Sequence, residues 1–71
     1  MIINNSKQFG QYMKERRKEL GYTQAYVAQA SGLSASFISN LENGKETAEI
    51  GKALFLCNVL GINLEMKNRG E

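Results

Sequence analysis

The sequence feature that most constrains the fold is a pair of helix-start signals on either side of one glycine. Thr23 and Ser34 are of the residue types that cap helix N-termini, and each precedes a segment whose apolar residues have helical spacing. Gly32 lies between them and can adopt the positive φ that a tight turn requires. The pattern predicts two short helices within residues 24–43, at a spacing that suits helices crossing at about 90–120°.

Longer helices are predicted before and after this pair. Apolar residues fall on one stripe from Ser6 to Leu20, where Ser6 is the expected N-cap and Gly21 the stop signal. A fourth helix is predicted from about Ala48 to Leu60, so that residues 6–60 form a helical core. The residues expected to face inward on it are Ile50, Ala53, Leu54, Cys57 and Leu60. This helix is apolar over most of its circumference and needs more cover than one small subunit provides, because it also carries Phe55, Leu56 and Val59.

The spacing of apolar residues changes from helical to alternating after Gly61. Residues 62–67 alternate between apolar and polar, which predicts a half-buried strand. A lone strand cannot satisfy its backbone groups, and two partners are open: the segment Met1–Ile3 or the same strand in a second subunit. We favour the second subunit, because it would also cover the fourth helix. The residues expected at this dimer contact are Phe55, Val59, Ile62, Leu64 and Met66.

The composition fits one small globular domain, residues 1–71, and does not favour an enzyme. The chain has 71 residues, of which 42% are hydrophobic. It contains no His and no glycine-rich phosphate loop, so we expect no catalytic residue, no metal site and no cofactor. Cys57 has no partner for an internal disulfide, and no signal peptide or membrane-spanning segment is recognisable. We therefore expect a cytoplasmic protein with no membrane partner.

The second short helix has an exposed face of unusual composition. Ile38 and Leu41 are expected to face inward, and no charged residue precedes Glu42. A solvated helix usually carries Lys and Glu in i,i+4 pairs. Small and amide side chains can instead approach base edges, where Asn pairs with adenine and an Ala methyl meets a thymine methyl. The other interpretation is an ordinary surface that is rich in Ser and Asn. The outward residues are Ala35, Ser36, Ser39, Asn40 and Asn43.

The net charge of +2 is only weakly basic, although four cations fall within residues 14–18. Such a run is most often a solvated helix face. A chain that binds phosphate with so little net charge must also use backbone donors and helix N-termini. We therefore place Thr23 and Ser34, which open the two short helices, among the residues expected at a DNA backbone.

The stretch from Phe9 to Lys45 resembles the lambda-repressor-like helix-turn-helix family, also called the xenobiotic-response-element family. The elements RKELGYTQ, VAQASGLS and ISNLENGK have the order and spacing of that family. The resemblance implies an all-α, compact four-helix DNA-binding domain whose third helix enters the major groove. The implied partner is double-stranded DNA, as an operator with two half-sites.

The resemblance also assigns roles to individual residues. Arg17 matches the arginine that pairs with the glutamate at the end of the recognition helix, here Glu42. Family members often have Gln, Arg or Lys where this chain has Ala35 and Ser36, so base readout would be shallower and DNA shape would matter more. The positions implied to contact bases are Ala35, Ser36 and Asn40, to which we add Ser39, and those implied to contact the DNA backbone are Gln24, Asn43 and Lys45.

The C-terminal half, with one helix and then a strand, resembles the HipB-type antitoxins, in which such strands pair across a dimer. The resemblance implies a homodimeric repressor that regulates its own operon and binds a toxin kinase similar to HipA. Other possible classes are a phage-type repressor, a restriction-controller protein and a protein-interaction module that has lost DNA binding. The last class would bind no duplex at any salt concentration, whereas a DNA-binding protein would bind with a strong dependence on salt.

Overall fold

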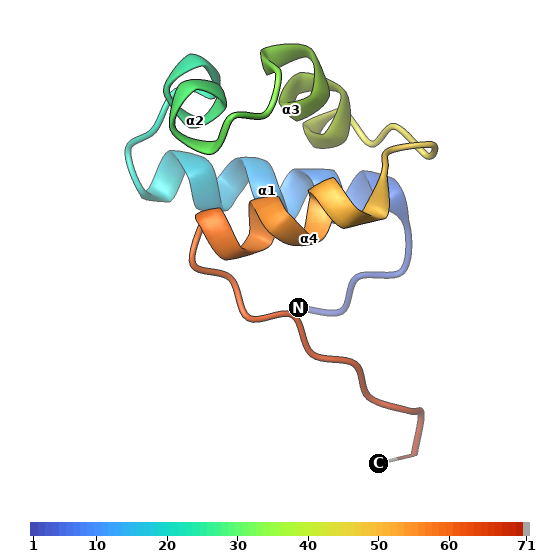
Figure 1. The fold of residues 1–71 in the computed structure, drawn as a ribbon. Coiled ribbons are helices and arrows are strands. Elements are labelled where there is room, and N and C mark those ends of the chain that lie inside the picture. Colours follow the sequence, from blue (N-terminus) through green and yellow to red (C-terminus); the bar gives the residue numbers. More distant parts are fainter. Residues whose placement is uncertain (71) are drawn as a thin grey trace.

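The computed structural model describes residues 1–70, in which four helices surround one core (Figure 1). The helices are α1 (Ser6–Glu19), α2 (Gln24–Ser31), α3 (Ala35–Glu42) and α4 (Ile50–Val59). Helices α2 and α3 pack across one side of α1, and the C-terminal tail leaves on the opposite side (Figure 1). None of these helices is both long and apolar enough to cross a membrane. The all-α, four-helix prediction is confirmed.

The short helix pair has the predicted boundaries because its start and turn signals act locally. The Thr23 hydroxyl accepts a hydrogen bond from the backbone N–H of Tyr26 at 3.0 Å, and that of Ser34 accepts one from Phe37 at 3.0 Å. Each cap contributes about 1 kcal/mol. Gly32 ends α2 with φ of 79°, a conformation that costs glycine little because it lacks a Cβ. These three residues fix the turn between α2 and α3.

The N-cap of α1 lies one residue earlier than predicted. Asn5 is the cap, and its side-chain oxygen accepts a hydrogen bond from the Gln8 backbone N–H at 2.8 Å. The Ser6 hydroxyl instead donates to the backbone oxygen of Gly44 at 3.0 Å. This bond ties the start of α1 to the loop between α3 and α4.

The predicted inward face of α4 is wrong in two of its residues. Ile50 and Leu54 are 74% and 43% exposed, whereas Leu56 is 1% exposed. Helix α4 is turned so that Cys57 contacts Met13 of α1, with the two sulfur atoms 3.8 Å apart. The error arises because a helix that is apolar all round leaves the choice of face to packing. The buried core consists of Met13, Val27, Ile38, Leu41, Ala53, Leu56, Cys57 and Leu60.

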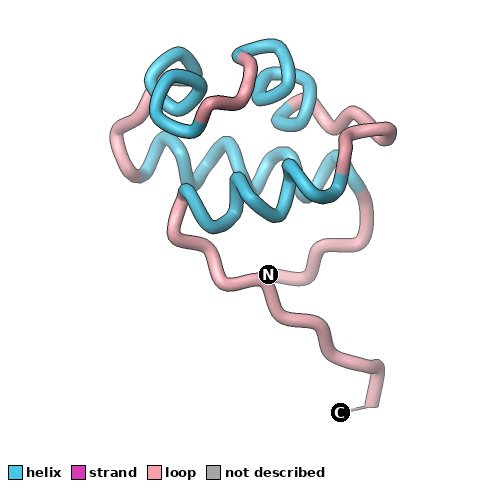
Figure 2. Tube along the Cα trace, in the orientation of Figure 1, coloured by secondary structure: helices cyan, strands magenta, loops and turns pink. Residues whose placement is uncertain are grey.

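The strand predicted for residues 62–67 is wrong for this chain on its own. Residues 62–70 have neither helix nor strand structure (Figure 2), and no backbone hydrogen bond joins them to residues 1–4. A strand needs a partner for its N–H and C=O groups, and the described chain supplies none. The intrachain alternative, pairing with Met1–Ile3, is therefore not observed.

Helices α1 and α3 approach each other unusually closely at Gly10. A Cβ atom at this position would lie 2.1 Å from the backbone oxygen of Leu41 and 2.8 Å from that of Glu42. The absence of a side chain at Gly10 therefore allows the C-terminal turn of α3 to rest directly on α1.

Candidate nucleic-acid interface

Helix α3 presents an uncharged face to solvent on the outer side of the fold. Ile38 is fully buried and Leu41 nearly so, which leaves the opposite arc of the helix free. Ser39 is half-buried at the edge of this arc. The side chains exposed on it are Ala35, Ser36, Asn40 and, at the C-cap, Asn43. These short side chains leave room for a base edge to approach, and the amides and hydroxyls can donate or accept hydrogen bonds.

The buried ion pair between Arg17 and Glu42 holds this helix in place. The Arg17 Nε donates to Oε2 of Glu42 at 2.7 Å, and Nη2 donates to Oε1 at 3.0 Å. The remaining nitrogen, Nη1, donates to the backbone oxygen of Tyr22 at 2.8 Å. One guanidinium thus fixes α1 to the end of α3 and to the segment before α2, in the two-pronged geometry that Arg forms with carboxylates.

The electrostatics of the pair favour its charged form. Burial acts to raise the pKa of Glu42, but hydrogen bonds from Arg17 and Gln24, together with the nearby charges of Arg17 and Lys14, hold that pKa below its ordinary value. The hydrogen bond with Glu42 outweighs burial and raises the pKa of Arg17. Both groups are therefore charged at neutral pH.

Gln24 lies half-buried at the start of α2 and takes part in the same network. Its side-chain nitrogen donates to Oε1 of Glu42 at 3.0 Å. An amide nitrogen carries two protons, so one proton remains for another acceptor such as a phosphate oxygen. The other residues expected at the start of these helices, Thr23 and Ser34, are exposed, and their hydroxyls already serve as caps.

The loop after α3 carries Asn43 and Lys45, both of which are exposed. The Lys45 backbone N–H donates to the oxygen of Asn40 at 3.0 Å, and that of Gly44 donates to Leu41 at 3.0 Å. These bonds close the C-terminus of α3. These hydrogen bonds hold the loop against the end of α3. Lys45 is the positively charged residue of this part of the loop.

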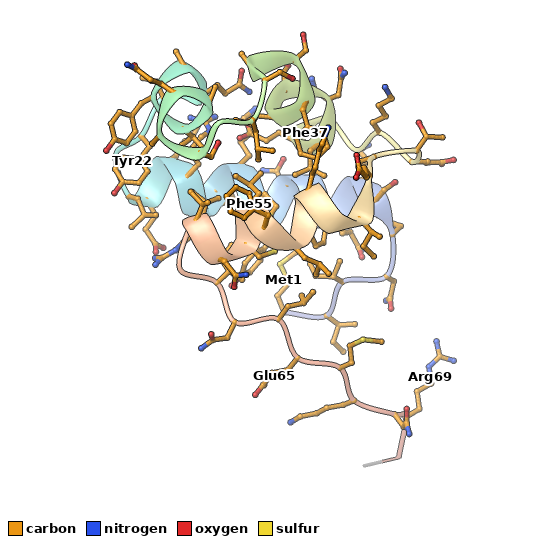
Figure 3. All side chains as sticks on the ribbon, viewed as in Figure 1. Met1, Tyr22, Phe37, Phe55, Glu65 and Arg69 are labelled. Carbon is orange, nitrogen blue, oxygen red and sulfur yellow. The ribbon has the colours of Figure 1, made fainter. Side chains whose placement is uncertain are left out.

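The structure does not gather all five residues expected at the dimer contact. Leu64 and Met66 are exposed on the tail, whereas Val59 and Ile62 are half-buried against the chain's own core. Phe55 lies on the side of α4 that is turned toward α2 and α3, away from the tail (Figure 3). Its side chain therefore does not share a surface with the tail.

Two apolar residues of α4 that are predicted to be buried, Ile50 and Leu54, are exposed instead. Ile50, Leu54 and Cys57 follow at i, i+4 and i+7 and so share one stripe of the helix. Cys57 lines an open groove of about 940 Å³ between residues 1–4 and the tail, together with Phe9, Met13 and Ile62. The sequence alone could not identify Ile50 and Leu54 as exposed, because their exposure depends on which face of α4 packs against the core.

Comparisons with known proteins gave matches in family, sequence and fold. A helix-turn-helix family model matches residues 13–66. An uncharacterised HTH-type transcriptional regulator, y4mF of Sinorhizobium fredii, is 35% identical over 69 residues, which is 97% of this chain and 91% of that protein. The solved HipB–O4 20mer complex has a TM-score of 0.88 at 23% identity over 97% of both chains. The HipA–HipB–O2–O3 complex gives a TM-score of 0.88 at 23% identity, again over 97% of both chains.

Proposed function

Since this chain belongs to the helix-turn-helix family of transcription regulators, we propose that it is a sequence-specific repressor whose third helix enters the major groove of its operator. The observation that carries the proposal is the exposed, uncharged arc of α3. A helix with small polar side chains can lie close enough to base edges to form direct hydrogen bonds. Residues 1–71 would act as a single domain, with α3 as its recognition helix.

We assign two sets of contacts to this interface. Ala35, Ser36, Ser39 and Asn40 face the bases, and Asn40 is the side chain best suited to a paired hydrogen bond with adenine. The DNA backbone is contacted at the start of α2 and α3 and at the loop after α3. This set comprises Thr23, Gln24, Ser34, Asn43 and Lys45. The buried pair of Arg17 and Glu42 holds the two sets of residues in fixed positions relative to each other, because its hydrogen bonds join the end of α3 to the start of α2.

Selection of bound duplexes from a random pool tests this function directly. A sequence-specific repressor enriches one motif, and a dimer enriches two similar half-sites whose centres are about 34 Å apart. A protein-interaction module of the same fold enriches no motif at any salt concentration.

Replacement of Asn40 by Ala is expected to weaken binding to the enriched duplex by about 1–3 kcal/mol and to relax preference at one base position. Asn40 is exposed, so the melting temperature should hardly change. Lys45→Ala serves as the comparison, because removal of a cation that binds phosphate weakens all duplexes alike. The measurement is a titration of each variant against matched and scrambled duplexes. An unchanged preference in Asn40→Ala would show that another face reads the bases.

We further propose that the chain forms a homodimer through its tail. The tail carries Leu64 and Met66 exposed, and the groove beside it exposes Met1 and Ile2 as well. A second copy of the tail would supply the backbone partners that residues 63–67 lack within one chain. We include Ile50 and Leu54 in this proposed contact, because they are exposed and lie on the stripe of α4 that ends at Cys57.

Leu64→Asp is expected to convert the dimer to monomers, because it would place a carboxylate in an apolar contact. Sedimentation velocity at micromolar concentration measures the change. Glu65→Gln is the matched control, since neighbouring residues of a strand point to opposite faces. The tail would not be the dimer contact if Leu64→Asp sedimented as a dimer.

The partner of this repressor is proposed to be a toxin similar to HipA, which would make the chain an antitoxin that regulates its own operon. The support is the close fold agreement with HipB in its complexes with DNA and with HipA, over almost the full length of both chains. Co-expression with the product of the adjacent gene, followed by purification through a tag on this chain, tests the idea. A stable complex in which that product loses its toxicity supports the antitoxin role, and its absence favours a stand-alone repressor.

A further inference from the structure

Three lysines lie on one face of α1, and none of them is among the DNA contacts assigned above. Lys7, Lys14 and Lys18 follow at i, i+7 and i+11, so their Cα–Cβ directions fall within about 40° of one another around the helix. We call them the lysine stripe. Lys7 and Lys18 are exposed, and Lys14 is half-buried.

The carboxylates of α1 and of the end of α3 have hydrogen-bond partners other than these lysines. Glu15 accepts a hydrogen bond from Gln11, and Glu19 pairs with Arg16. Glu42 is taken by Arg17. No lysine of the stripe forms an ion pair within residues 1–70, where the one paired lysine is Lys52 of α4. The positive charges of the three lysines are therefore not neutralised by a direct ion pair within residues 1–70.

The contacts of α1 show which side of the fold the stripe occupies. Gly10 and Arg17 mark the face of α1 that touches the end of α3. Met13 and Arg16 mark the face that touches α4, through Cys57 and the backbone oxygen of Leu60. At about 100° per residue, the stripe lies roughly 70° from the Gly10–Arg17 face, on the side away from α4. It thus borders the end of α3.

Two of the three lysines lie close to residues that we assign to the DNA backbone or that bind them. At one end, a Cβ added to Gly44 would lie 2.8 Å from the Cα of Lys7, so Lys7 adjoins the loop that carries Lys45. Further along, the charge of Lys14 acts on Glu42, to which Gln24 is hydrogen-bonded. Lys7 and Lys14 therefore lie beside this set of residues, and Lys18 continues the same face of α1.

We propose that the lysine stripe is a second phosphate-binding surface, which extends the contact with the DNA backbone from the helix-turn-helix onto α1. This inference rests on the proposed DNA-binding function. Its occupant is the sugar–phosphate backbone of duplex DNA, whose dense negative charge suits a row of cations about 16 Å long. Because phosphates carry no sequence information, the stripe adds affinity and leaves the base preference unchanged.

The test replaces the stripe and measures how binding depends on salt. The variant carries Lys7→Gln, Lys14→Gln and Lys18→Gln, which keep the helix-forming character of α1. Arg69→Gln is the charge control, because Arg69 lies in the tail, far from α2 and α3 (Figure 3). Each protein is titrated with a synthetic duplex of arbitrary sequence and with the enriched duplex, between about 50 and 200 mM salt. Circular dichroism checks that each variant is folded.

We expect the magnitude of the slope of log K against log salt to fall by about 0.9 for each phosphate that the variant no longer neutralises. The triple variant should lose at least two phosphate contacts per protomer, and its slope should decrease accordingly. The ratio of affinities for the two duplexes should stay the same, and Arg69→Gln should keep the wild-type slope. The phosphate-binding role of the lysine stripe would be wrong if the folded triple variant kept the wild-type slope, or if Arg69→Gln lowered the slope as much as the triple variant does. Either result would leave the proposed DNA-binding function intact. If the wild-type protein binds neither duplex, the proposed function fails as well. Should the triple variant not fold, Lys7→Gln and Lys18→Gln, both at exposed positions, give the same comparison singly.

Discussion

Gly10→Ala is expected to destabilise the protein by about 3 kcal/mol or more, because the new methyl group would overlap the backbone of α3. The added Cβ would lie 2.1 Å from the oxygen of Leu41, and a backbone atom cannot turn away as a flexible side chain can. A domain of this length has a total stability of roughly 4–10 kcal/mol, so the decrease is a large fraction of it. Urea unfolding followed by circular dichroism measures the change.

The matched control for this prediction is Gly51→Ala in α4. It is the same substitution within a helix, but the nearest atom to the added Cβ is a side-chain oxygen of Glu49 at 4.0 Å. Alanine is favoured over glycine in an exposed helix by about 0.5–1 kcal/mol, so this variant should be slightly more stable than the wild type. Equal effects of the two substitutions would contradict the close approach of α1 and α3.

Arg17→Met is expected to cost about 3–5 kcal/mol, because it leaves the carboxylate of Glu42 buried without its cation. The double variant with Glu42→Leu should recover most of this stability, since a buried ion pair contributes little net stability relative to apolar residues of similar size. The pair of Arg16 and Glu19, in which the carboxylate is exposed, provides the control, and Glu19→Gln should change stability by less than about 1 kcal/mol. Chemical unfolding of the wild type, the two single variants and the double variant gives the double-mutant cycle.

The dependence of folding stability on pH provides a second test of the pair of Arg17 and Glu42. The pKa of Glu42 is lowered in the folded state, so its contribution is fully present above its ordinary pKa and is lost as the pH falls through the lowered value. Wild-type stability should therefore decrease over this acidic range. The double variant should lose less stability over the same range, and an identical acid dependence would show that the pair is not charged in the folded protein.

The parts of the fold that the sequence predicts well are those that local signals determine. Thr23, Gly32 and Ser34 act on residues within four positions of themselves, and the structure has α2 and α3 where these signals place them. Helical spacing in α3 likewise identifies Ile38 and Leu41 as inward, because these apolar residues share one face. The outward arc follows from the same spacing.

The parts that the sequence predicts poorly depend on distant contacts. Periodicity could not choose a face for α4, and the choice depends on Met13 and on Arg16, whose Nε donates to the oxygen of Leu60 at 2.9 Å. Nothing near Gly10 in the sequence reveals that a backbone from α3 lies against it. The alternation in residues 62–67 shows the character of a strand, but a strand forms only where a partner is available.

The central claim is that the outward arc of α3 faces DNA, and photocrosslinking tests it most directly. The enriched duplex would carry photoreactive thymine analogues at each position of a half-site, and crosslinked peptides would be identified by mass spectrometry. The structure predicts crosslinks within residues 35–43, with few or none on α4. Crosslinks confined to α4 or the tail, or none at low salt, would contradict the assignment of α3 as the recognition helix.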